Sequence, residues 1–272
     1  MKRWLAYLII AAIYMYNSGV SAITLGHLTL VDPERGARDI VYEKIDGYAV
    51  VEGDILIGKL SRPSKTSSNT PHAMIIQRIE GERWPHGIIP FELDETLPFA
   101  NKLAILQAIN AWQQSTNVLF VELTSKNRDQ YPDFLLFVPV PGTTCSSFVG
   151  KQGGAQVIRL APRCNTFSTA HELGHALGLW HEQSRSDRDA YIQIVWENID
   201  EHYRYNFDQH LSDGQDYGDY DYESVMHYNA YAFSTNGKKT IIPLQSNIEI
   251  GQRDHLSNKD AAAVKAMYLK GL

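Results

Sequence analysis

The hydrophobic positions predict a domain that combines strands with helices. Four short stretches are rich in branched and aromatic residues, as strands are. They are Gly87 to Leu93, Val118 to Leu123, Asp133 to Pro139 and Gln156 to Leu160. Between the first two stretches, apolar residues recur from 103 to 112 at helical spacing, which predicts a helix with one face turned toward the core.

Two further helices have recognisable start signals. Asn165 is suited to cap a helix, and Ser257-Asn258-Lys259-Asp260 resembles a capping box before an alanine-rich run. From 187 to 252 the pattern is irregular and predicts loops. We therefore expect an α+β fold of two lobes, with the sheet and two helices in one, and loops in the other.

The first 22 residues predict a signal peptide. Lys2-Arg3 provide a positive start, Leu5 to Tyr16 an apolar segment, and Val20-Ser21-Ala22 a small-residue cleavage site. The alternative is an uncleaved anchor, but the apolar segment is shorter than the ~20 residues of a membrane span. We expect a secreted protein that is not inserted in a membrane after cleavage.

The stretch from His171 to Glu182 predicts a catalytic zinc site. His171 and His175 are four residues apart, so they share one face of a helix and can bind one ion. Gly178 can end the helix in a left-handed conformation, and His181 then supplies a third ligand. Three protein ligands leave one position open for water, and Glu172 is close enough to act on that water. The alternative is an amphipathic helix with partly exposed histidines.

The same residues resemble a known family. His-Glu-x-x-His-x-x-Gly-x-x-His is the metzincin signature, and Ser224 to Tyr228 fits the methionine turn that should follow it. Glu182, Tyr228 and Arg185 to Asp189 resemble the astacin family of zinc endopeptidases. The resemblance runs from Trp84-Pro85 to Leu244 and implies a metzincin fold. In that fold a mixed twisted sheet and two helices lie above a cleft, and a loop-rich lobe with a C-terminal helix lies below.

The resemblance also implies roles for individual residues. One Zn²⁺ would be bound by the three histidines, with Tyr228 as a movable fifth ligand that assists as the oxyanion forms. Glu172 would be the general base. Met226 would form an apolar floor under the histidines, and Glu182 would contact the ammonium group that maturation releases.

Residues 23–72 are expected to form an inhibitory prosegment, and 73–272 the catalytic domain. Val51-Glu52-Gly53-Asp54 resembles the Phe-x-Gly-Asp motif of astacin prosegments, with valine in place of phenylalanine. The resemblance implies that Asp54 occupies the open zinc position. The alternative is an ordinary Gly-Asp turn between strands Tyr48 to Val51 and Ile55 to Ile57. A linker from 61 to 71 would be cut to give an N-terminus near Ala73.

Composition limits the kinds of binding partner and bears on whether the two cysteines are oxidised. A net charge of −6 offers no basic surface for nucleic acid, and 44% hydrophobic residues are ordinary for a soluble domain. Cys145 and Cys164 are the only cysteines, and export would let them form a disulfide. Zinc ligation by a free thiol is the alternative. Animal astacins usually have a second disulfide, so its absence resembles bacterial members.

The expected function is hydrolysis of internal peptide bonds in polypeptide substrates. Gly150 to Leu160 is expected to provide an edge strand on which an extended substrate pairs through its backbone. Two alternatives stay open: a zinc-containing binding or adhesive protein without turnover, and a metal-dependent amidase that acts on cell-wall peptides. The pattern indicates no particular oligomeric state.

Overall fold

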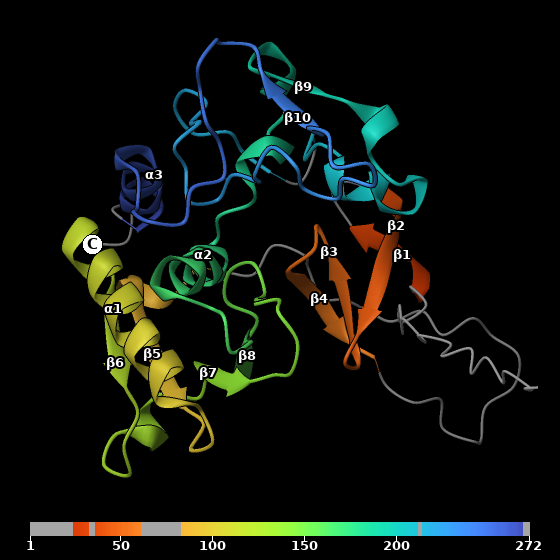
Figure 1. Ribbon diagram of the computed structural model, residues 1–272. Coiled ribbons are helices and arrows are strands. Elements are labelled where there is room, and N and C mark those ends of the chain that lie inside the picture. Colours follow the sequence, from red (N-terminus) through yellow and green to blue (C-terminus); the bar gives the residue numbers. More distant parts are fainter. Residues whose placement is uncertain (1–23, 33–35, 61–82, 212–213, 269–272) are drawn as a thin grey trace, which may run out of the picture.

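The computed structural model describes residues 24–32, 36–60, 83–211 and 214–268. Its chain forms an N-terminal group of strands, a sheet with two helices, and a loop-rich C-terminal part (Figure 1). The predicted signal peptide, the linker and the maturation site near Ala73 lie outside the described residues. Within these ranges, the structure contains no helix that is both long and apolar enough to span a membrane.

The central sheet contains the four predicted strands. They are β5 (Ile88–Leu93), β6 (Leu119–Glu122), β7 (Phe134–Pro139) and β8 (Ala155–Leu160). The strands are parallel and lie in the order β6-β5-β7-β8. An antiparallel bridge from Ser146 to Arg159 continues the sheet beyond β8 and makes it mixed at this edge.

Helices α1 (Phe99–Ser115) and α2 (Thr166–Leu177) pack against each other and against the sheet. The indole of Trp112 is fully buried and donates to Ala170 O at 2.9 Å, which joins the two helices. Asn165 caps α2 as predicted, because its side chain accepts from Ser168 N at 2.8 Å. The predicted strands and helices of this lobe are thus confirmed.

The C-terminal part contains little regular structure, also as predicted. It has short 3-10 helices, a two-stranded ribbon of β9 (Ile192–Ile194) and β10 (Ile241–Pro243), and helix α3 (Asn258–Tyr268). The capping box forms: Ser257 Oγ accepts from Asp260 N, and Asp260 Oδ2 accepts from Ser257 N. Tyr268 then donates to Leu177 O at 3.0 Å and joins α3 to the end of α2. The expected α+β metzincin architecture is confirmed.

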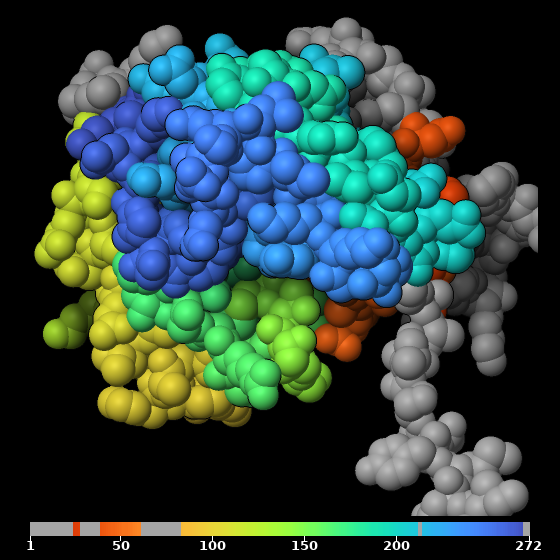
Figure 2. All heavy atoms as spheres, turned by 45° about the horizontal axis from the view of Figure 1, so that its top comes forward, coloured from red at the N-terminus to blue at the C-terminus, as the bar shows by residue number. Residues whose placement is uncertain are grey.

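The N-terminal strands form a separate antiparallel sheet in the order β1-β2-β3-β4. These strands are β1 (Leu25–Asp32), β2 (Gly36–Ile45), β3 (Tyr48–Val51) and β4 (Ile55–Lys59). Their apolar side chains share a cluster with Val149 and Trp180 of the following domain. In Figure 2 the orange atoms of this segment lie between lime-green atoms of the sheet lobe and blue atoms of the C-terminal part. The segment thus fills space between the two lobes.

Candidate metal centre

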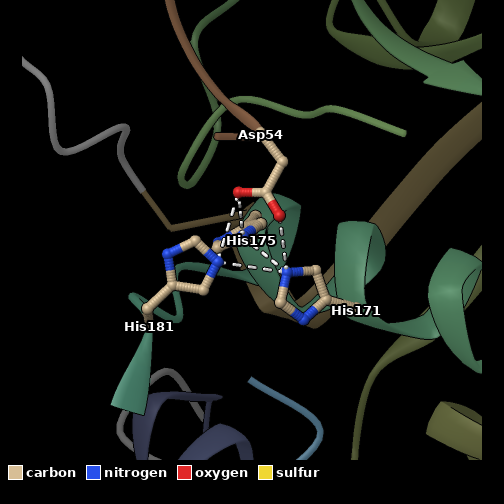
Figure 3. A group of neighbouring side chains, drawn as sticks. All are labelled: Asp54, His171, His175 and His181. Carbon is tan, nitrogen blue, oxygen red and sulfur yellow. Dashed lines mark hydrogen bonds and ion pairs between the residues drawn. The ribbon is translucent and has the colours of Figure 1, made fainter. Parts of the chain in front are cut away.

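Three imidazoles converge where α2 ends (Figure 3). His171 and His175 come from α2, and Gly178 ends this helix with φ of +111° and its N–H on His175 O. The chain then returns His181 to the same place. The Nε2 atom of His171 lies 3.1 Å from that of His175 and 3.2 Å from that of His181. The structure thus brings the three predicted ligands together.

Each imidazole is held by its other nitrogen. The Nδ1 atoms of His171 and His175 lie 2.8 Å from the carbonyl oxygens of Val225 and Leu179. A carbonyl only accepts, so these Nδ1 atoms carry the protons and their Nε2 lone pairs face the centre. Burial lowers the pKa of His171 to about 3 and also lowers that of His175, so both are neutral at pH 7. Such contacts on the Nδ1 atoms orient the rings of histidines that bind a metal through Nε2.

The donor set fits zinc. Nitrogens about 2.0–2.1 Å from a tetrahedral zinc are ~3.3 Å from each other, close to the separations found here. One atom each from Asp54, His171, His175 and His181 lie within 4.8 Å of one another. Two buried oxygens, Asp54 Oδ1 and Glu172 Oε2, have no hydrogen-bond partner among the described residues. A cation bound among the histidines would satisfy the Asp54 oxygen.

Asp54 points into the group of histidines. Its Oδ2 atom lies 3.2 Å from His171 Nε2, and its Oδ1 atom lies 3.2 Å from His181 Nε2 and 3.6 Å from His175 Nε2. Burial opposes ionisation, but the charge of a protonated His181 outweighs it and holds the pKa of Asp54 well below its usual value. The carboxylate thus lies where a fourth zinc ligand would.

The backbone around Asp54 also forms the turn that was considered as an alternative. Glu52 and Gly53 have φ of +48° and +78° and lie between β3 and β4. The turn is what directs Asp54 toward the histidines. The two interpretations of this motif are therefore compatible.

Glu52 was not predicted to have a role, yet it is 5% exposed and lies beside His181. Its Oε2 atom lies 2.8 Å from His181 Nδ1 and accepts from Ser184 Oγ at 2.9 Å, while Oε1 lies 2.5 Å from His210 Nε2. Burial disfavours its charge, but His210 and His181 outweigh burial and lower the pKa of Glu52. The only sequence signal was an acidic residue two positions before Asp54, and many surface turns contain one.

Glu172 is 2% exposed and lies beside the histidines, on the turn of α2 that carries His171. Burial and the nearby charge of Asp54 raise its pKa well above the usual value. A carboxyl group with a raised pKa in this position is suited to exchange protons with a bound water.

Tyr228 and Met226 lie below the histidines. The Tyr228 hydroxyl donates to Glu52 O at 2.5 Å and so contacts the N-terminal segment. Met226 is 1% exposed, and its Sδ atom would lie 2.6 Å from a Cβ atom added to Gly174, so this helix position has room only for glycine.

The neighbouring His227 is fully buried and neutral. Its Nδ1 atom lies 2.7 Å from Tyr228 O, and its Nε2 atom lies 2.7 Å from the Tyr220 hydroxyl. A neutral imidazole with the proton on Nδ1 satisfies both contacts. Burial and the charge of Arg253 together lower its pKa to about 4, although the contact with the carbonyl works in the opposite direction.

Glu182 borders a small cavity of about 40 Å³ below the site. Its Oε1 atom accepts from Asp221 N at 2.7 Å and lies 3.6 Å from Arg185 Nη1. Burial raises the pKa of Glu182 to about 8, although Arg185 works in the opposite direction. Glu182 is therefore a largely covered acid next to free space, not the fully exposed glutamate that its sequence position would also allow.

The N-terminal segment pairs with Ser147, which donates to Asp54 O and accepts from Leu56 N. Strand β8, within the predicted edge from Gly150 to Leu160, is the last strand of the sheet, and Ser146 bridges to it at Arg159. The pairing of this edge with a substrate stays a prediction. The predicted disulfide between Cys145 and Cys164 is present and fixes the start of the segment that contains Ser146 and Ser147.

Comparison with known proteins identifies relatives of most of the chain. Residues 77–269 match the family model described as Astacin (Peptidase family M12A). Zinc metalloproteinase nas-4 of Caenorhabditis elegans is 38% identical over 228 residues, which are 80% of this chain and 68% of that protein. The astacin-like metalloendopeptidase of Mus musculus is also 38% identical over 228 residues, 80% of this chain but 48% of its own length.

A solved structure shows the same similarity. High choriolytic enzyme 1, a hatching enzyme zinc-protease from the medaka fish Oryzias latipes, superposes with a TM-score of 0.61 at 33% identity. The superposition covers 70% of this chain and 94% of that one.

Proposed function

Since the chain belongs to the astacin family of zinc metalloendopeptidases, we propose that it is secreted as a latent precursor and hydrolyses internal peptide bonds after maturation. In this proposal residues 1–22 are the signal peptide, 23–72 the inhibitory prosegment, and 73–272 the catalytic domain. The observation that carries the proposal is the position of Asp54, whose carboxylate lies 3.2 Å from two of the three candidate zinc ligands.

The proposed ligands of the zinc are His171, His175 and His181, with Asp54 as a fourth in the precursor. When bound, zinc would polarise the scissile carbonyl and acidify the attacking water. Glu172 takes the proton from that water and returns it to the leaving amine. Its burial supports this role, because a raised pKa makes the carboxylate a stronger base toward the water.

Removal of the prosegment changes the surroundings of Tyr228 and His181. The Tyr228 hydroxyl loses the carbonyl of Glu52 and becomes available to the metal or to the oxyanion of the substrate. His181 loses the carboxylate on its Nδ1 atom. Maturation thus opens the fourth metal position and frees a hydroxyl group in one step.

Glu182 is proposed to receive the new N-terminal ammonium group. The largely covered acid, its raised pKa and the adjacent cavity support this role, since a cation placed there would pair with the carboxylate. The disulfide between Cys145 and Cys164 supports export to an oxidising compartment.

The experiment that tests this proposal compares matured wild type with Glu172→Gln on casein and on quenched peptides. The variant should bind one zinc per chain and lose at least about 10²–10⁴-fold in kcat, the usual contribution of a general base. Turnover by Glu172→Gln at the wild-type rate would refute the general-base role. Wild type that holds zinc but cleaves neither substrate would favour a binding protein, and release of products from cell-wall peptides alone would favour an amidase.

A further inference from the structure

Arg159 is a buried cation whose contacts come from the prosegment. It lies on β8, beside the cleft, and is 5% exposed. Its Nη2 atom lies 2.5 Å from Asp46 Oδ2, and its guanidinium carbon lies 5.1 Å from the centre of the Tyr48 ring. Among the described residues, these two prosegment groups are the ones that the guanidinium contacts. The catalytic domain contributes a cation here, and the prosegment contributes the anion.

The backbone of Arg159 is held by the catalytic domain itself. Ser146 and Arg159 exchange two backbone hydrogen bonds, of 3.0 and 2.9 Å. Cys145, the residue before Ser146, forms the disulfide that holds the same edge. Ile158 and Leu160 are fully buried in the core, so the alternation of the strand directs the Arg159 side chain away from the core. The backbone of Arg159 therefore keeps its place when the prosegment leaves, and its side chain still points away from the core.

A hollow of about 380 Å³ lies next to Arg159. It is lined on one side by the prosegment, including Asp46, and on the other by the loop 140–144. Departure of the prosegment would enlarge this hollow and open it to substrate. The guanidinium would then lie at its wall without the carboxylate that now compensates its charge.

The hollow lies close to the site of hydrolysis. Ser147 pairs with Asp54, the residue at the metal centre, and Ser146 next to it pairs with Arg159. The segment 146–147 therefore lies between Arg159 and residue 54, which places their backbones two strand spacings, ~10 Å, apart. At ~3.3 Å per residue, the side chains of an extended substrate that could reach it lie ~2–3 residues from the cut.

We propose that Arg159 is a specificity residue of the mature enzyme and binds an acidic side chain of the substrate within ~2–3 residues of the scissile bond. This inference rests on the proposed function. A guanidinium matches a carboxylate in geometry and charge, and Asp46 already makes this contact from the prosegment side. The prosegment and the substrate then compete for the same cation.

The test measures kcat/KM of matured enzyme on a peptide series in which one residue at a time, on either side of the cut, is changed from Gln to Glu. Wild type should favour Glu over Gln by about tenfold at one or two positions, the size of a hydrogen bond to a charged group. Arg159→Gln should lose this preference, and Arg159→Glu should favour Lys there. The preference of wild type should also weaken as salt is raised, because salt screens the pair.

Arg128→Gln is the matched control. Arg128 also lies over an aromatic ring, that of Phe134, and near a carboxylate, that of Glu92, but both partners belong to the catalytic domain. This variant should keep the wild-type preference.

A wild-type enzyme that cleaves the Gln peptides but shows no preference for Glu, or one insensitive to salt, would overturn the inference and leave the proposed function intact. The inference also fails if Arg159→Gln retains full activity on the Gln peptide and an unchanged preference for Glu. Failure of wild type to cleave any peptide would instead refute the proposed function, and this inference with it.

Discussion

Asp54→Ala should produce a precursor that is partly active while its prosegment is still attached. The substitution removes a carboxylate that is within 3.6 Å of all three histidines. Loss of one partner of a buried charge pair costs about 3–5 kcal/mol. Taking ~3 kcal/mol and tenfold per 1.4 kcal/mol, the fraction of molecules with an open cleft should rise about 100-fold.

Latency should not be abolished, because other contacts hold the prosegment. Glu52 keeps its bonds to Ser184 and His210, and Ser147 still pairs with the backbone at residue 54. Asp54→Asn, which retains an oxygen of similar position, should give an intermediate increase.

The assay is hydrolysis of a quenched peptide by purified precursor, with N-terminal sequencing before and after to show that the prosegment is intact. Asp39→Asn, at an exposed carboxylate of the same segment, should stay as latent as wild type. The double variant with Glu172→Gln should be silent, which excludes a contaminating protease. An intact Asp54→Ala precursor as latent as wild type would refute the inhibitory role of this carboxylate.

Three further variants test the fold around the site. Replacing Cys145 and Cys164 by Ser opens a link across 19 positions and should lower the free energy of unfolding by about 3 kcal/mol in a denaturant titration, whereas an unchanged midpoint would contradict this. Wild type should lose stability as pH falls from the ordinary histidine pKa of 6.5 toward about 4, because unfolded chains bind the proton that buried His227 excludes. In His227→Gln this loss of stability should be smaller, by up to about 3 kcal/mol, because the titrating group is gone. A pH profile identical to that of wild type would assign the loss to other groups. Gly174→Ala should destabilise the protein by about 1–3 kcal/mol, because its Cβ would meet Met226, despite the better helix propensity of alanine; a stabilised variant would contradict the packing.

The parts of the site that could be predicted from the sequence are those set by local geometry. His171 and His175 are four residues apart on one helix, and Gly178 supplies the conformation that ends it. These features depend on a few neighbouring residues. The strands and the capped helices were predictable for the same reason.

Contacts between distant segments were predictable only through the family resemblance, or not at all. The contact between Asp54 and His171 spans 117 positions, and the motif around Asp54 was its only signal. The contacts from Glu52 to His210 and from Asp46 to Arg159 span 158 and 113 positions. No local pattern marks a carboxylate whose partner is set by tertiary packing.

The pairing of Ser146 and Ser147 beside β8 was not predicted, for a related reason. The segment from Cys145 to Val149 is short and has no clear alternation of apolar and polar residues, so it was not predicted as a strand. Its place outside β8 depends on the bridge to Arg159 and on the disulfide, which are contacts in three dimensions.

The most direct test of the account is a crystal structure of the zinc-loaded precursor. The account predicts one zinc bound by the Nε2 atoms of His171, His175 and His181 and by an Asp54 oxygen at about 2.0–2.2 Å, with no water in the fourth position. A zinc ion with a water in that position, and the Asp54 carboxylate turned away from it, would contradict the account.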